Sequence, residues 1–219
     1  MQRKADIERK SNETQIKVSL NVDGTGKTKI KTPIGFLDHM LGLFAFHGYF
    51  DLDLSVTGDT HIDIHHTNED IGIVLGKAFK KALGDEKAGI KRFGSAFAPM
   101  ESTLGHAVVD ISGRGHLRID GISSRQDELE NEILEKLGEG KDVSAKAKEY
   151  SLQHAEHFLD SFAKQLGANI IVTVKNTESA DVHTILETVF KSLGMALDQA
   201  TKIDSRRQGL VPSTKGIID

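Results

Sequence analysis

The segment 59–79 predicts a strand that passes directly into a helix, and this junction restricts the possible folds more than any other part of the sequence. Apolar and polar residues alternate from Val56 to Ile64, as they do along a half-buried strand. Beyond this point the large apolar residues recur at helical spacing, at Ile71, Leu75 and Phe79. The pattern therefore places residues 65–69 where the strand becomes a helix.

Three potential metal ligands lie at this junction. His65 precedes Glu69 by four residues and His66 precedes it by three, and both spacings put imidazole and carboxylate on one surface of a helix. Two imidazoles and a carboxylate suit zinc, manganese, iron or nickel, and the spacing does not select among these metals. The alternative is a solvated helix start whose polar side chains cap free backbone N–H groups.

A second copy of the pattern favours the metal-site interpretation. His183 and Glu187 repeat the four-residue spacing within the segment 183–191. Repeated helix starts that carry ligands indicate a duplicated half-domain. We therefore expect a first half over residues 1–90 and a second half over residues 91–219.

Composition excludes several classes of protein. The chain has 219 residues, 38% hydrophobic and 27% charged, which is typical of a globular protein with a proper core. Its net charge of −4 gives no reason to expect nucleic acid as a partner, and without cysteine any metal must be bound by histidine and carboxylate. No apolar run approaches the ~20 residues of a membrane span, and the first residues lack the apolar core of a signal peptide. We therefore expect a cytoplasmic protein without membrane partners.

The N-terminal part of the sequence predicts strands. Their expected ranges are Ala5–Arg9, Glu13–Val22 and Lys27–Thr32, with residues 23–26 as a hairpin turn between the last two. Residues 50–56 also alternate cleanly and predict a half-exposed strand. Glu13 lies in an alternating run, where an exposed carboxylate opposite a lysine is the simplest interpretation.

A helix is predicted from Phe36 to Phe46. Its apolar residues lie nearly all around it, as they do in a buried helix. His39 falls inside this pattern, and a histidine on an apolar helix is more often a hydrogen-bonded core residue than a metal ligand.

The second half predicts a mixture of strands, helices and a charged insertion. Residues 105–120 indicate a strand bent at 112–115, where Arg114 lies between two glycines. A guanidinium there suits phosphate, although a solvated arginine in a β-bulge fits equally well. Residues at about 122–152 are charged and predict an inserted or peripheral helical segment. The remaining predicted elements are a helix over 154–166, a strand over 170–175 and a helix over 182–200.

Several short segments keep a definite order and spacing over most of the chain apart from about residues 120–150. They are Ile34–Met40, Asp63–Asp70, Arg92–Gly94, Asp110–Arg114, Glu187 with Phe190 and Lys191, and Pro212–Gly216. In this order the sequence resembles the imidazoleglycerol-phosphate dehydratase family of histidine biosynthesis. The resemblance implies an α+β fold in two pseudo-symmetric halves, each a four-stranded sheet backed by helices, the ribosomal protein S5 domain 2-like class. It also implies a carbon–oxygen lyase that dehydrates imidazole glycerol phosphate to imidazole acetol phosphate, with two Mn²⁺ ions between the subunits of a homo-oligomeric 24-mer.

The resemblance also assigns metal ligands. One ion would be held by His39, His66, His183 and Glu187, and the other by His65, Glu69 and two histidines of the second half. Those two histidines are replaced here by Thr173 and Thr184, and Ser102 stands where the family has a glutamate. Either the second ion binds weakly, with water, His154 or His157 as a substitute ligand, or the chain has lost full activity.

Substrate and catalytic roles follow from the same resemblance. It assigns substrate binding to Glu13, Arg92, Arg114, Ser213 and Lys215, and catalysis to Glu13, His39, His66 and Glu69. The proton removed lies on a carbon beside the imidazole ring and is not acidic, so the reaction needs charge to spread into the ring. Metal ions on the ring nitrogens would act as Lewis acids, with Glu13 as an acid or base. Two hypotheses remain: a working dehydratase with an altered second metal site, and a metal-stabilised paralogue or assembly protein with weakened activity.

Overall fold

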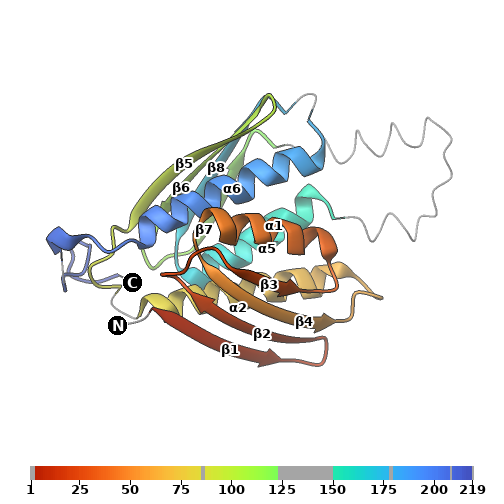
Figure 1. Ribbon diagram of the computed structural model, residues 1–219, viewed down its shortest axis with the longest axis horizontal. Helices are drawn as coiled ribbons and strands as arrows, with labels where there is room; N and C mark the ends of the chain where they lie inside the picture. Colours follow the sequence, from red (N-terminus) through yellow and green to blue (C-terminus); the bar gives the residue numbers. More distant parts are fainter. Residues whose placement is uncertain (1–2, 85–86, 123–149, 178–179, 208, 219) are drawn as a thin grey trace.

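A computed structural model of the chain describes residues 3–84, 87–122, 150–177, 180–207 and 209–218. The strands are β1 (Lys4–Lys10), β2 (Thr14–Asn21), β3 (Thr28–Lys31), β4 (Asp51–Gly58), β5 (Phe93–Met100), β6 (Thr103–Asp110), β7 (His116–Asp120) and β8 (Asn169–Lys175). The helices are α1 (Gly35–His47), α2 (Ile64–Leu83), α5 (Leu152–Leu166) and α6 (Val182–Thr201), followed by the short 3₁₀ helix η1 (Ser205–Arg207). Figure 1 shows the four α-helices lying between two sheets.

The two sheets have the same topology. Their strand orders are β1-β2-β4-β3 and β5-β6-β8-β7. In each sheet two neighbouring pairs are antiparallel and the last pair, β3 with β4 or β7 with β8, is parallel. The expected α+β fold of two pseudo-symmetric four-stranded sheets backed by helices is therefore confirmed, whereas the boundary at residue 90 stays a prediction.

Residues 23–26 do not form the predicted hairpin turn. β4 lies between β2 and β3 in the sheet. The Asp51 carboxylate at the start of β4 accepts hydrogen bonds from the backbone N–H of Thr25, at 2.8 Å, and of Lys27, at 3.1 Å. These bonds hold the loop beside β4, so β3 runs parallel to β4 and α1 supplies the crossover that a parallel pair requires.

The predicted strand up to His65 also ends early, because β4 stops at Gly58 and residues 59–63 form a turn. A strand would have put Ile62 and Ile64 on the same buried face, but Ile62 is 69% exposed whereas Ile64 is buried. Asp63 begins the helix instead: its side chain accepts a hydrogen bond from the backbone N–H of His65 at 3.0 Å.

The strands of the second half differ from the sequence-based prediction at two places. Residues 105–120 form two strands, β6 and β7, on either side of β8, because the link between them departs from the sheet where the Gly113 N–H donates to the Gly167 carbonyl. No strand was predicted over residues 93–100, where β5 forms. Residues 123–149, which make up most of the predicted charged insertion, lie outside the described residues. At the predicted end of the insertion, Tyr150 and Leu152 are buried.

The helices of the two halves share one aromatic core. Phe44 of α1, Phe79 of α2 and Phe162 of α5 contact one another, with ring centroids between 5.6 and 6.0 Å apart. Each such pair contributes roughly 0.5–1.5 kcal/mol beyond the burial of its surface. The core thereby fixes the helices that carry the candidate site.

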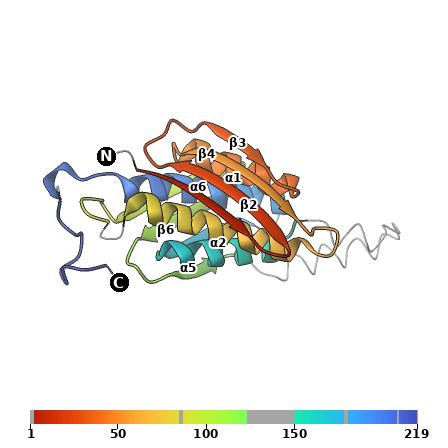
Figure 2. The same ribbon diagram turned by 90° about the horizontal axis from the view of Figure 1, so that it is seen from below.

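Two glycines allow α2 and α5 to pack closely. A side chain at Gly72 would approach the Phe158 carbonyl oxygen to 2.5 Å, and one at Gly76 would approach the Phe162 carbonyl oxygen to 2.6 Å. Because the glycines are four residues apart, they lie on one face of α2. The two helices lie side by side (Figure 2). Gly72 meets Phe158 and Gly76 meets Phe162, so the helices run in the same direction and their N-terminal ends are neighbours. None of the helices in the described ranges is long and apolar enough to cross a membrane.

Candidate metal centre and anion site

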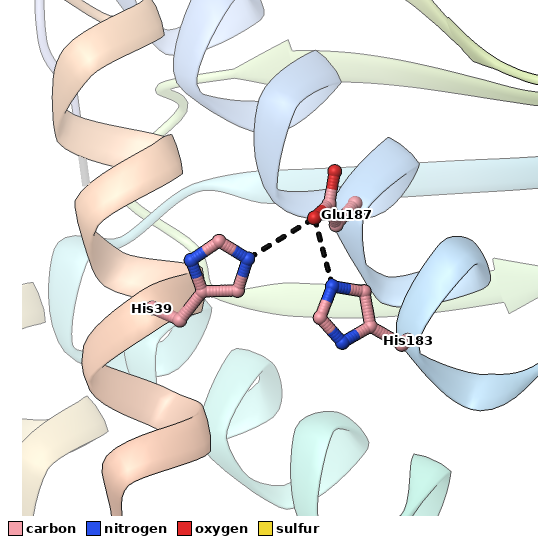
Figure 3. A group of neighbouring side chains, drawn as sticks. All are labelled: His39, His183 and Glu187. Carbon is pink, nitrogen blue, oxygen red and sulfur yellow. Dashed lines mark hydrogen bonds and ion pairs between the residues drawn. The ribbon is translucent and has the colours of Figure 1, made fainter.

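Two histidines converge on one carboxylate oxygen. His39 comes from α1, whereas His183 and Glu187 lie one turn apart at the start of α6 (Figure 3). Glu187 Oε1 lies 3.0 Å from His39 Nε2 and 2.9 Å from His183 Nε2. The ligand atoms of the three residues all lie within 4.8 Å of one another. The nitrogen and oxygen atoms of the group are the kind that borderline divalent ions prefer.

Glu187 is held ionised. Burial opposes its charge, but hydrogen bonds from Lys191, His39 and His183 together lower the pKa of its carboxyl group to about 2. Lys191 is one turn further along α6 and contacts Oε2, so the oxygen that faces the histidines is Oε1. A buried carboxylate that is already ionised is a ready metal ligand.

His39 is not a core histidine. Its side chain is 46% exposed and that of His183 is 49% exposed, although Glu187 between them is buried. The group therefore opens toward the surface of the chain, where a further ligand or a substrate could reach it.

His66 is held elsewhere. Among the described residues, the group of ligand atoms within 4.8 Å contains His39, His183 and Glu187 but not His66. Instead His66 Nδ1 lies 3.2 Å from Asp59 Oδ2, and this hydrogen bond raises the pKa of the imidazole. The other Asp59 oxygen is buried and has no hydrogen-bond partner in the described part of the chain. A carboxylate on Nδ1 leaves Nε2 as the metal-binding nitrogen, as in many metal centres.

A second group forms where α2 meets α5. His65 Nδ1 lies 3.1 Å from His157 Nδ1, and its Nε2 lies 3.8 Å from Glu69 Oε2. His154, the other possible substitute ligand, is used differently: its Nδ1 accepts a hydrogen bond from the backbone N–H of Ser151 and caps α5. Burial lowers the pKa of His154, which favours the neutral form of its imidazole. His157 is thus the histidine that the fold brings to His65.

The two threonines that replace family histidines lie in different places. Thr173 lies on β8 directly opposite His106, and its neighbours Val172 and Val174 point into the core. Since side chains alternate along a strand, Thr173 faces away from the helices and from His65. Thr184 follows His183 at the start of α6, where its N–H donates to Asp181 at 2.7 Å.

Glu13 lies near His66. The Glu13 carbonyl accepts a hydrogen bond from the backbone N–H of Asp59 at 3.2 Å, and the negative charge of Glu13 contributes to the raised pKa of His66. The next residue, Thr14, is buried and donates to Asp70 of α2 at 2.6 Å. This bond fixes the start of β2 on α2 and so fixes the position of Glu13.

The candidate anion-binding residues lie in loops of the second half. Arg92 precedes β5, Arg114 follows β6, and Ser213 and Lys215 belong to the C-terminal segment. The Ser213 hydroxyl accepts a hydrogen bond from the backbone N–H of Lys215 at 3.2 Å. Arg92 reaches the same segment, since its Nη1 donates to the carbonyl of Pro212 at 3.0 Å.

Sequence reasoning assigned no role to Lys191, Asp59 or Asp110, whereas it did name His157 as a possible substitute ligand. Lys191 could have been found from its four-residue spacing after Glu187. Asp59 was read as part of a strand, and nothing local in the sequence shows that Asp110 meets Arg92 or that His157 meets His65.

Comparisons with known proteins all point to one family. The model of the family described as imidazoleglycerol-phosphate dehydratase matches residues 32–197. Among curated relatives, a protein of that name from Geobacter sulfurreducens is 49% identical over 216 residues, which cover 99% of each chain. Another from Pelobacter propionicus is 45% identical over 218 residues, which cover 100% of both chains.

Solved structures agree with the sequence comparison. A crystal structure of IGPD from Pyrococcus furiosus is 32% identical with a TM-score of 0.72, over 96% of this chain and 99% of the other. A crystal structure of imidazoleglycerol-phosphate dehydratase from Staphylococcus aureus is 27% identical with a TM-score of 0.70, over 92% and 99% of the two chains.

Proposed function

Because the chain belongs to the imidazoleglycerol-phosphate dehydratase family, whose members are carbon–oxygen lyases of histidine biosynthesis, we propose that it dehydrates imidazole glycerol phosphate with the help of divalent metal. The product is imidazole acetol phosphate, and Mn²⁺ is the proposed ion. The convergence of His39 and His183 on Glu187 carries the proposal, because it offers three ligand atoms to one ion.

The chain's own residues would hold the ions as follows. His39, His183 and Glu187 form the first site, and His66, which lies outside that group, would complete it from a second copy of the chain. His65, Glu69 and His157 form the second site, in which His157 takes the place of a missing histidine. Metal bound to the ring nitrogens of the substrate would stabilise the negative charge that develops when the proton leaves.

The remaining residues would bind and orient the substrate. A phosphate monoester carries nearly two negative charges, which Arg92, Arg114 and Lys215 can neutralise and the Ser213 hydroxyl can hydrogen-bond. Holding the phosphate places the reacting carbon at a fixed distance from the imidazole-binding groups. Glu13, near His66, is the proposed acid or base that moves the proton.

A turnover assay tests the proposed function. The purified protein, incubated with imidazole glycerol phosphate and Mn²⁺, should form imidazole acetol phosphate detectable by mass spectrometry, and a strong chelator should stop the reaction. His183→Gln should abolish the reaction, whereas His116→Gln, which changes an exposed histidine on β7, should not. Absence of product from metal-loaded wild-type protein would support the weakened paralogue instead.

Arg114→Ala is predicted to weaken phosphate binding. Loss of one charge-assisted contact costs roughly 1.5–3 kcal/mol, so the dissociation constant for imidazole glycerol phosphate or inorganic phosphate should rise by about ten- to a hundredfold. Titration calorimetry measures this change, with Arg118→Ala on exposed β7 as the matched control. Equal affinity of wild type and Arg114→Ala would show that the arginine does not contact phosphate.

Chelation is predicted to lower the order of the oligomer. If a first site needs His66 from another copy, the ion holds two subunits together, and its removal weakens their contact. Light scattering before and after treatment with a chelator should show a fall in mass, from the proposed 24-mer to smaller assemblies, reversed by Mn²⁺. An unchanged mass after verified metal removal would contradict a metal shared between subunits.

A further inference from the structure

Arg92 joins three segments that are far apart in the sequence. Its Nε and Nη2 donate to Asp110 at 2.6 and 3.1 Å, and its Nη1 donates to the Pro212 carbonyl at 3.0 Å. The guanidinium side chain is only 18% exposed and that of Asp110 is 24% exposed. Such a bidentate pair has a fixed geometry as well as a favourable energy.

The backbone of Arg92 is fixed as firmly as its side chain. Its N–H donates to the Ala200 carbonyl at the end of α6 at 2.8 Å, and its carbonyl accepts from the N–H of Ile111 at 3.1 Å. Arg92 also adopts a φ of 73°, in the left-handed region that strains the backbone of a non-glycine residue. The fold therefore accepts local strain to aim this side chain.

The guanidinium of Arg92 has N–H groups bonded within the protein and N–H groups left for a ligand. A guanidinium has five N–H groups. In the described part of the chain, Asp110 and the Pro212 carbonyl occupy three of them and leave two for an anion. Pro212 itself is buried, although the segment that follows it, residues 214–217, is exposed. The contact with Arg92 therefore ties an otherwise exposed segment to the body of the protein.

We propose that Asp110 is a positioning residue of the phosphate site: it holds Arg92 so that the guanidinium docks the segment 211–215 and presents its remaining N–H groups to the substrate phosphate. This inference rests on the proposed function. It also explains why a carboxylate lies in a phosphate site. By its charge alone Asp110 would weaken phosphate binding, because it cancels the charge of Arg92 where a dianion must bind. Asp110 then acts through Arg92 on both Ser213 and Lys215.

The sign of the effect of Asp110→Asn separates positioning from simple electrostatics. Removing a negative charge near a phosphate site should tighten phosphate binding if charge alone matters. Loss of the bidentate contact should instead weaken inorganic phosphate binding by about tenfold, the scale of one charge-assisted hydrogen bond. Asp120→Asn is the matched control. Asp120 also accepts hydrogen bonds from an arginine, Arg118, on the same sheet, and its replacement changes the net charge of the protein by the same amount.

Two measurements on the full-length, metal-loaded protein decide the proposal. Titration calorimetry with inorganic phosphate gives the affinity, and hydrogen exchange followed by mass spectrometry gives the protection of backbone amides in residues 209–216. We expect Asp110→Asn to weaken phosphate binding and to speed exchange in this segment, and Asp120→Asn to change neither. Metal content should stay that of wild type, and KM should rise more than kcat falls.

Arg92→Lys is a second variant, in case Asp110→Asn fails to fold. It keeps the positive charge but lacks the planar fork that bonds Asp110 at two points while reaching the Pro212 carbonyl, so it should also release the segment. Unchanged exchange in residues 209–216 for both variants, or tighter phosphate binding by Asp110→Asn, would overturn the proposal. A wild-type protein without dehydratase activity would refute the proposed function, whereas the exchange result would still decide whether Asp110 and Arg92 hold the segment.

Discussion

Replacing Glu187 with alanine is expected to remove one metal ion per chain and to lower the dehydratase activity at least a hundredfold. Its Oε1 atom is the point on which His39 and His183 converge, so the change removes one ligand and the orientation of two others. Losing even an outer partner of a metal ligand typically costs 10–100-fold in affinity or activity. Elemental analysis of dialysed protein and the turnover assay measure the two losses.

The same substitution should also destabilise the metal-free protein. Lys191, with a side chain only 18% exposed, would lose the carboxylate that it contacts. An unsatisfied buried group costs about 1–3 kcal/mol, and more if it is charged. Thermal unfolding in the presence of a chelator measures this loss of stability without the contribution of bound metal. Glu8→Ala, which breaks an exposed ion pair on β1, is the control. Wild-type metal content in Glu187→Ala would show that the three-residue group is not a metal site.

Gly76→Leu is expected to have the second large effect, on stability and on the second metal site alike. A side chain at this position would enter the space of the Phe162 backbone carbonyl, which cannot rotate away as a side chain could. Overpacking of this kind typically costs 1–3 kcal/mol, and occasionally more. Because α2 and α5 would be forced apart, His65 and His157 should separate and bind metal more weakly, while the group around Glu187 keeps its ion.

Gly42→Ala provides the matched control, because a Cβ atom at this position of α1 would meet no atom of a neighbouring element within 4 Å in the described part of the chain. Alanine there should leave stability unchanged or raise it by up to about 1 kcal/mol, from its higher helix propensity. Calorimetric unfolding and metal analysis of both variants test the comparison. A Gly76→Leu protein as stable as Gly42→Ala would mean that α2 and α5 do not need their close contact.

Local periodicity predicted the helices that carry ligands. The apolar pattern of α1 and the four-residue spacing of His183 and Glu187 are properties of single helices, and the structure reproduces both elements. The alternation of apolar and polar residues wrongly predicted a strand at residues 59–63, because a loop can have the same pattern. In the structure these residues form a loop, and Asp63 at its end caps α2. The burial of Ile64 and the exposure of Ile62 also distinguish the loop from a strand.

Contacts between distant segments could not be predicted from the residues themselves. His39 and Glu187 are 148 positions apart, and His65 and His157 are 92 apart. The first pair depends on how α1 packs against α6, and the second on the glycines that let α5 approach α2. Strand order is similarly non-local, since the loop that contains residues 23–26 bonds the Asp51 carboxylate of β4, and β3 pairs with β4 rather than with β2.

Titration of the metal-free protein with Mn²⁺, with dehydration of imidazole glycerol phosphate measured at each step, tests the central claim most directly. We predict no product without metal and activity that rises to a plateau at two ions per chain. His157→Ala should bind one ion tightly under the same conditions. Full activity in verified metal-free protein, or no activity with both ions bound, would contradict a metal-dependent dehydratase.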